Sequence, residues 1–227
     1  KPMAIVVFMS SLSERVARET ICEIGRRLHQ KGWLAAADGN ISLRLASNNI
    51  LITPSGVHKG YLTPDEICRI TIDNRVLEGQ PSGERLMHLA VYKNAPKAVA
   101  VVHAHPPVAT AWTVARPEMQ ELPNDCLSEV ILAAGRIPFV PYAQPGTAQM
   151  GENLLPFLPD CRLMILSRHG ALSWGESLPE AYNGMERLEH AAVTLAHAVA
   201  MGGTTSLPKE EVARLWEMRA RSDGRTL

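Results

Sequence analysis

Apolar and polar positions follow two different periods along this chain of 227 residues. From Ser13 to Gln30 the apolar residues recur close to the helical period, which predicts an amphipathic helix that ends at Gly32. Ser11 and Glu14 have the spacing of a capping box and place the start of this helix close to Ser13. Apolar and polar residues then alternate from Ile41 to Leu45, which predicts a half-buried strand. The chain therefore mixes helices and strands from its beginning.

The same mixture continues to the C-terminus without a regular strand–helix–strand rhythm. Unbroken apolar runs predict buried strands, and capping residues followed by helical periodicity predict helices. The predicted strands are Ile50–Thr53, Ile70–Asp73 with Val76–Leu77 as a hairpin, Ala98–His105 and Leu163–Ser167; the predicted helices are one capped by Ser82 and ending near Asn94, Pro179–Met201, and Pro208 to about Arg221 capped by Ser206. This pattern favours a layered α/β domain with a mixed sheet over a doubly wound fold.

Composition and charge limit the classes of partner. The chain has 23 Lys and Arg against 23 Asp and Glu, and neither a repeat nor a linker interrupts it, so we expect a single domain over residues 1–227. A balanced charge offers no basic field to nucleic acid or to a membrane surface. An anionic ligand would therefore have to be bound by a local pocket.

Cysteine usage and the N-terminal segment bear on the compartment. Cys22, Cys68, Cys126 and Cys161 are isolated in the sequence, as is typical of buried thiols in a reducing compartment. The apolar stretch Ala4–Met9 is too short for the hydrophobic part of a signal peptide, and no apolar run is long enough for a membrane span. We expect a soluble, cytoplasmic protein.

Three histidines stand out by their positions. His103 and His105 are two residues apart on a predicted strand, so the pleat places both imidazoles on one face. His169 ends another apolar strand and is followed by Gly170, where the chain must turn. Three neutral imidazoles suffice for a catalytic zinc and leave one coordination position open. The alternative is a pair of histidines that are merely hydrogen-bonded at the end of a strand.

Glu84 and His88 lie close to the predicted start of the helix before the His103 strand. A carboxylate at Glu84 could complete the metal site or act as an acid/base beside it. It could equally be an ordinary first-turn residue that complements the helix dipole. His88 is one helical turn further on, where it could support Glu84 or be a hydrogen-bonded core residue.

Several short motifs occur in an order that resembles a known family. They are Asp38-Gly39-Asn40-Ile41-Ser42, Ile52-Thr53-Pro54-Ser55-Gly56, Pro81-Ser82-Gly83-Glu84, Val101-Val102-His103-Ala104-His105-Pro106, Pro141-Tyr142-Ala143 with Pro145-Gly146-Thr147, and His169-Gly170-Ala171. From about Ser13 to Gly203 the sequence resembles the class II aldolase/adducin family, typified by L-fuculose-1-phosphate aldolase. The resemblance implies a layered α/β/α domain whose central mixed, mostly antiparallel sheet is flanked by helices.

The resemblance also implies roles for particular residues. His103, His105 and His169 match the family's zinc-binding histidines, and Glu84 matches the glutamate that ligates zinc and serves as acid/base; manganese or cobalt could replace zinc. The segments that would surround a substrate phosphate are Gly39-Asn40, Ser55-Gly56 and Ser82-Gly83. Such a pocket needs no Lys or Arg, because backbone N–H groups and hydroxyls at turns can hold a dianion. The resemblance further implies a homotetramer with its active sites at subunit interfaces.

The activity implied is that of a lyase. It would cleave or form a carbon–carbon bond in a ketose phosphate, through a metal-stabilised enediolate, giving dihydroxyacetone phosphate and an aldehyde. Glu84 favours this reaction over epimerisation, because the family's epimerases have aspartate there. Glu129 stands where fuculose-phosphate aldolase has a tyrosine from a neighbouring subunit, and could mark another substrate.

Alternatives remain on the same metal site and on the same fold. Family members also dehydrate a sugar phosphate or decarboxylate a keto acid phosphate. A non-catalytic, adducin-like interaction module is disfavoured, because this chain keeps all three histidines and Glu84. A purely structural zinc site is disfavoured because such sites usually have four protein ligands, often including cysteines.

Overall fold

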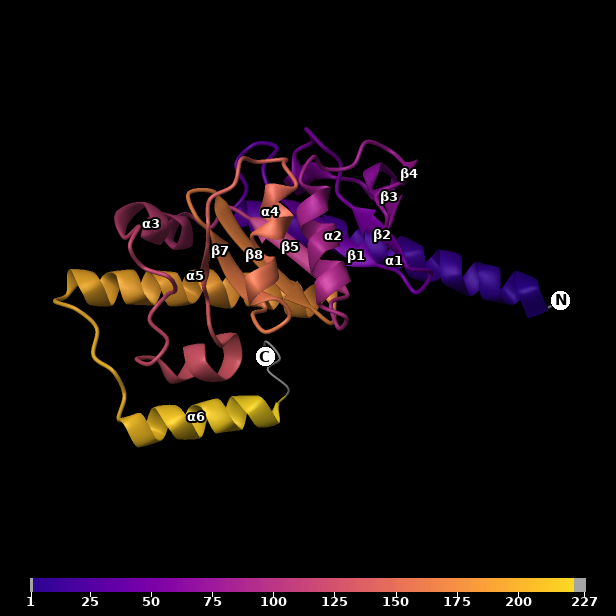
Figure 1. The fold of residues 1–227 in the computed structure, drawn as a ribbon. Coiled ribbons are helices and arrows are strands. Elements are labelled where there is room, and N and C mark those ends of the chain that lie inside the picture. The colour runs from indigo at the N-terminus through magenta and orange to yellow at the C-terminus, as the bar shows by residue number, and fades with distance from the viewer. Residues whose placement is uncertain (1, 223–227) are drawn as a thin grey trace.

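One eight-stranded sheet organises the chain in the computed structural model, which describes residues 2–222 and, for side chains, those from Glu14 onwards. The strand order is β4-β3-β2-β1-β5-β8-β7-β6 (Figure 1). Only β6 and β7 pair in parallel, and every other neighbouring pair is antiparallel. The fold is therefore an α/β fold with a mixed, mostly antiparallel sheet, as the sequence predicted.

The strands and helices have the following bounds. The strands are β1 (Asn40–Arg44), β2 (Asn49–Ile52), β3 (Cys68–Thr71), β4 (Val76–Glu78), β5 (Ala100–Ala104), β6 (Phe139–Val140), β7 (Leu163–Leu166) and β8 (Gly170–Gly175). The α-helices are α1 (Pro2–Gln30), α2 (Arg85–Asn94), α3 (Pro107–Ala115), α4 (Gln149–Glu152), α5 (Leu178–Ala200) and α6 (Lys209–Arg221). Shorter helical turns are η1 (Lys59–Tyr61), η2 (Pro64–Glu66), the π-helix η3 (Val130–Ala134) and η4 (Leu155–Phe157).

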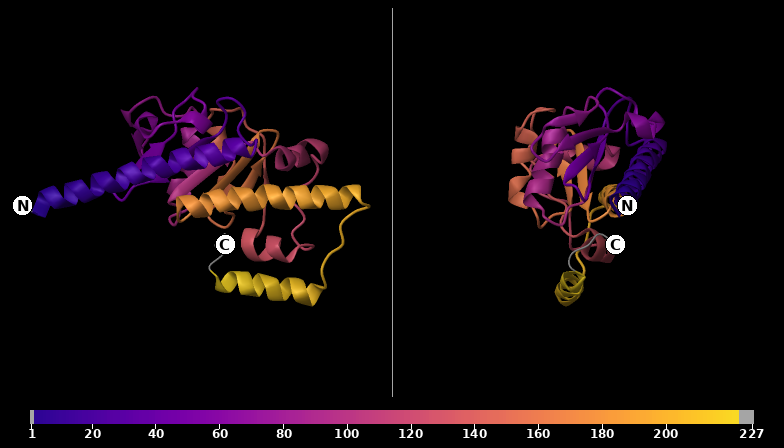
Figure 2. Two further views of the ribbon diagram at one scale, coloured as in Figure 1. Left: turned by 180° about the vertical axis from the view of Figure 1, so that it is seen from behind. Right: turned by 90° about the vertical axis from the view of Figure 1, so that its right-hand side faces the viewer.

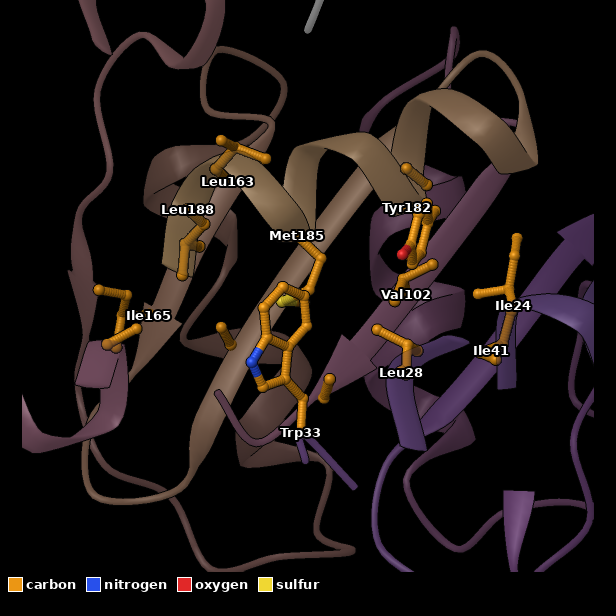
Figure 3. Close-up of a cluster of buried hydrophobic side chains, with 14 of the residues drawn as sticks. Ile24, Leu28, Trp33, Ile41, Val102, Leu163, Ile165, Tyr182, Met185 and Leu188 are labelled. Carbon is orange, nitrogen blue, oxygen red and sulfur yellow. The ribbon is translucent and has the colours of Figure 1, made fainter. Parts of the chain in front are cut away.

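Helices cover both faces of the sheet (Figure 2). On one face α1, α3 and α5 pack against alternate strand residues such as Ile41 and Val102, and Figure 3 shows part of this cluster around Met185. On the other face α2 and α4 pack against the residues of opposite parity, including Val101 and Leu172. Because successive strand side chains point to opposite faces, each apolar strand supplies both cores. Helix α6 lies outside these layers, against η3.

Three helix starts differ from the sequence prediction. Helix α1 already begins at Pro2, so Ser11 does not mark its start; no helix-breaking residue separates Pro2 from Ser13. The N-cap residue of α2 is Glu84 and not Ser82, because the Ser82 N–H group bonds the Thr53 carbonyl and keeps the backbone extended there. The N-cap of α6 is Pro208, and the Ser206 hydroxyl instead bonds Asp125.

The structure also bears on the cysteines and on membrane insertion. All four cysteines are free thiols, and all but the half-buried Cys126 are buried. Within residues 2–222 no helix combines the length and apolar character needed to cross a membrane. The burial of Cys22, Cys68 and Cys161 agrees with the sequence prediction, and the partial exposure of Cys126 does not.

Candidate metal centre and active site

The three predicted histidines meet at one end of neighbouring strands. His103 lies near the end of β5, His105 just beyond it, and His169 in the tight turn between β7 and β8. The sheet brings them together because β8 pairs with both β5 and β7. One ligand nitrogen from each ring lies within 4.8 Å of the others.

The facing atoms are the Nε2 nitrogens. His103 Nε2 is 3.2 Å from Nε2 of His169 and 3.2 Å from Nε2 of His105. Nδ1 of His103 lies 2.9 Å from the Ala171 carbonyl, which can only accept, so Nδ1 carries the proton and Nε2 presents its lone pair. Asp38 Oδ2 faces His105 Nδ1 at 3.4 Å and favours the same tautomer there. Converging lone pairs repel one another unless a cation lies between them, so this cluster fits a divalent metal ion.

Glu84 faces the same centre from the start of α2. Its Oε2 atom is 3.3 Å from His103 Nε2, and its Oε1 atom is 3.3 Å from His169 Nε2. Asn40 occupies the position paired with His103 on β1, and its Nδ2 atom donates to Glu84 Oε2 at 2.8 Å. The structure therefore brings the carboxylate and all three histidines into one site.

The protonation states suit metal binding. Burial alone would raise the pKa of Glu84, the hydrogen bond from Asn40 opposes that rise, and positive charge at the histidine cluster lowers the pKa below its ordinary value. Burial, together with the neighbouring His103 and His169, lowers the pKa of His105 to about 3. At neutral pH the site thus offers an ionised carboxylate and a neutral imidazole at His105, which are the forms that bind metals.

The predicted phosphate segments lie next to this centre in the chain and in space. The Ser55 N–H group bonds the Gln80 carbonyl, and the Ser82 N–H group bonds the Thr53 carbonyl, so the two serine segments run side by side. Ser55, Gly56 and Gly83 are exposed, whereas Ser82 is buried and its Oγ accepts the Glu84 N–H group. Gly39 has a φ of +69° and lies directly against the backbone of His103.

Glu129 lies elsewhere in the monomer. It is exposed at the start of η3 and lines an open cavity of about 1040 Å³ with Trp33, Pro107 and residues of α5. None of the three clustered histidines lines this cavity. Within one chain, Glu129 thus shares no cavity with the three clustered histidines.

Sequence reasoning missed several residues that support the site. Asp38 orients His105, and the buried Lys59 donates from Nζ to the Ala37 carbonyl at 2.5 Å beneath the loop that carries Asp38. Burial lowers the pKa of Lys59, and the charges of Asp38 and Glu84 oppose that shift. The alternation from Ile41 to Leu45 predicted an exposed Ser42, so its burial, like the position of Lys59, was not readable without the fold.

The fold and the site define a metal-dependent enzyme with a three-histidine centre. Residues 19–195 match the model of the class II aldolase and adducin N-terminal domain, and the chain belongs to this family.

Its relatives have different activities. The chain is 36% identical to 3-oxo-tetronate 4-phosphate decarboxylase of Escherichia coli strain K12, over 79% of this chain and 85% of that protein. It is 33% identical to L-fuculose phosphate aldolase of Methanococcus vannielii, over 76% and 90% of the two chains. The crystal structure of YgbL from Escherichia coli superposes with a TM-score of 0.85 at 32% identity, over 90% of this chain and 99% of that one.

Proposed function

We propose that this protein is a zinc-dependent lyase that decarboxylates a phosphorylated 3-oxo sugar acid. The bond between the carboxyl carbon and C2 breaks, and its electron pair stays on C2, next to the C3 carbonyl. Carbon dioxide leaves, and C2 takes up one proton. For 3-oxo-tetronate 4-phosphate the other product is dihydroxyacetone phosphate, the compound expected from aldol cleavage of a ketose phosphate.

The position of Glu84 carries this proposal. Both of its oxygens face the histidine cluster at 3.3 Å, so a substrate carbonyl bound there lies beside an ionised carboxylate. A bound divalent ion supplies Lewis-acid stabilisation of the negative charge that develops on the carbonyl oxygen. Glu84 then holds the proton that C2 receives, after taking it from solvent.

A phosphate group would be held by the segments beside Glu84. Among the described residues, the N–H groups of Gly56 and Gly83 donate no hydrogen bond, so both are available to an anion. The exposed Ser55 hydroxyl adds a further donor. Asn40 is engaged at both ends of its amide, with Glu84 and with His88, so its contact with phosphate remains a prediction.

One observation and one chemical consideration favour decarboxylation over aldol cleavage. Several relatives at up to 36% identity are 3-oxo-tetronate 4-phosphate decarboxylases. In addition, aldol cleavage needs a second group that takes the proton of the departing aldehyde's hydroxyl, whereas loss of carbon dioxide does not. Aldol cleavage remains the second candidate, because the chain is also 33% identical to a fuculose phosphate aldolase.

A direct comparison of substrates tests the proposal. The zinc-loaded protein is incubated with 3-oxo-tetronate 4-phosphate and, separately, with L-fuculose 1-phosphate. Carbon dioxide and dihydroxyacetone phosphate are then quantified. We expect equal amounts of both products from the first substrate and little turnover of the second. Turnover of the second substrate alone would replace decarboxylation by aldol cleavage, and turnover of neither would reject both.

A further inference from the structure

A chain of buried polar side chains runs behind Glu84 on the sheet face that α2 covers. Asn40 and Ser42 point to this face from β1, and His88 and Tyr92 reach it from successive turns of α2. Ser42 Oγ lies 2.7 Å from His88 Nδ1 and 2.8 Å from the Tyr92 hydroxyl. His88 Nε2 bonds Asn40 Oδ1, and Asn40 Nδ2 donates to Glu84.

The donors and acceptors on these side chains fix which group donates in each hydrogen bond of the series. An ionised Glu84 can only accept, so Asn40 must turn its NH₂ group toward Glu84 and its oxygen toward His88. The His88 ring must then carry its proton on Nε2, and its Nδ1 must accept from the Ser42 hydroxyl. Ser42 has no second proton, so Tyr92 is the donor to Ser42.

We propose that His88 is a positioning residue that fixes the orientation of the Asn40 amide and, through it, aims the Glu84 carboxylate at the metal centre, with Ser42 donating to Nδ1 of the required His88 tautomer and Tyr92 donating to Ser42. This inference rests on the proposed role of Glu84. It gives a function to a buried histidine that does not itself contact the three clustered histidines.

The burial of His88 restricts its ring to a neutral form with a single N–H group. His88 is completely buried, and burial lowers its pKa to about 3, so the ring stays neutral and has only one N–H group. If that proton moved to Nδ1, it would face the Ser42 oxygen, and Nε2 would face the Asn40 oxygen with lone pairs opposed. The amide would then turn its oxygen toward Glu84 and repel the carboxylate.

The tautomer can be measured without metal or substrate. Nitrogen chemical shifts of ¹⁵N-histidine-labelled, metal-free protein distinguish a protonated from a bare ring nitrogen, and the His88 signals are assigned by their loss in the His88→Gln variant. We expect the proton on Nε2 of His88. A proton on Nδ1, or a charged ring at pH 7, would overturn the proposal whatever reaction the enzyme catalyses.

Zinc affinity, measured by competition with a chelator, tests the effect on the centre. His88→Met removes the donor to Asn40 and should weaken zinc binding about ten- to a hundred-fold, the usual effect of losing a group that orients a ligand. His88→Gln keeps a donor at the same place and should restore most of the affinity. On an Asn40→Ala background, His88→Met should add no more than about twofold, because its effect passes through Asn40.

A pair of buried serines supplies the control. Ser42→Ala should weaken zinc binding, whereas Ser173→Ala should not, because the equally buried Ser173 Oγ has no hydrogen-bond partner among the described residues. Unchanged affinity in His88→Met would overturn the proposal, as would additive losses with Asn40→Ala. Absence of zinc binding by the unaltered protein would instead reject the metal-dependent function, so the two failures are distinguishable.

Discussion

The role proposed for Glu84 combines metal binding with proton transfer, and replacing one carboxylate oxygen by an amide NH₂ group tests the two separately. Glu84→Gln keeps the shape of the side chain but removes the basic carboxylate. We expect most of the metal to remain, while proton exchange at the carbon of bound dihydroxyacetone phosphate slows by roughly two to four orders of magnitude. NMR in heavy water measures this exchange, with the exposed Glu210→Gln of α6 as control. Exchange at the unaltered rate would remove Glu84 from the proposed role.

The titration of the His88 ring makes the free energy of unfolding depend on pH. The unfolded chain takes up a proton near the ordinary histidine pKa of about 6.5, whereas the folded chain does so near 3, because burial outweighs the charge of Glu84. Between these values the unfolded state binds more protons, so the free energy of unfolding falls with falling pH by about 1.4 kcal/mol per unit.

Urea unfolding of the metal-free protein at pH 7 and pH 5 measures this dependence. The His88→Gln variant has no titrating ring at this position and should lose less stability between the two pH values. Equal losses in both proteins would show that other groups cause the acid sensitivity.

At the scale of elements, the start of β8 is held close to the histidines. A Cβ atom at Gly170 would lie 2.5 Å from the Ala104 carbonyl oxygen and 2.7 Å from the His105 ring. Gly170→Ala should therefore push these segments apart, costing about 1–3 kcal/mol of stability and weakening metal binding. Gly32→Ala is the control, because it strains a positive φ of +72° with no atom within 4 Å. Calorimetry and chelator competition distinguish them: only Gly170→Ala should change affinity.

The sequence allowed some elements to be predicted and concealed others. The period of α5 and the apolar runs of β5 and β7 are local patterns, so these elements and the position of His169 at a turn were predicted correctly. Strand β8 was missed, because its small residues and glycines lack the apolar run of its neighbours, although it joins the histidine-bearing segments.

The site was likewise only partly predictable. The pair His103 and His105 follows from strand geometry, and Glu84 joins them through the resemblance. The link from His88 to Glu84 could not be predicted as it occurs, because it passes through Asn40, whose position depends on the register between β1 and β5. Tertiary pairing of this kind leaves no periodic trace in the sequence.

At the scale of the whole molecule, we expect four chains to assemble. Light scattering should give a mass close to four times the chain's 24.8 kDa. Glu129 shares no cavity with the three histidines within one chain, so we expect it to act in the reaction across a subunit interface. If it does, mixing inactive Glu84→Gln and Glu129→Ala subunits should restore part of the activity. A fully active monomer would contradict both expectations.

The meeting of His103 with His169 has a consequence for the amount of folded protein. These residues are 66 positions apart, so an unfolded chain does not hold them together, and an ion that binds them stabilises only the native state. At a hundred times its dissociation constant, such an ion adds about 2.7 kcal/mol. The melting temperature should rise with zinc concentration, and His103→Ala and His169→Ala should abolish the rise. In a cell short of metal, unloaded chains would unfold and be degraded more often, so metal supply would set the abundance of the enzyme as well as its turnover.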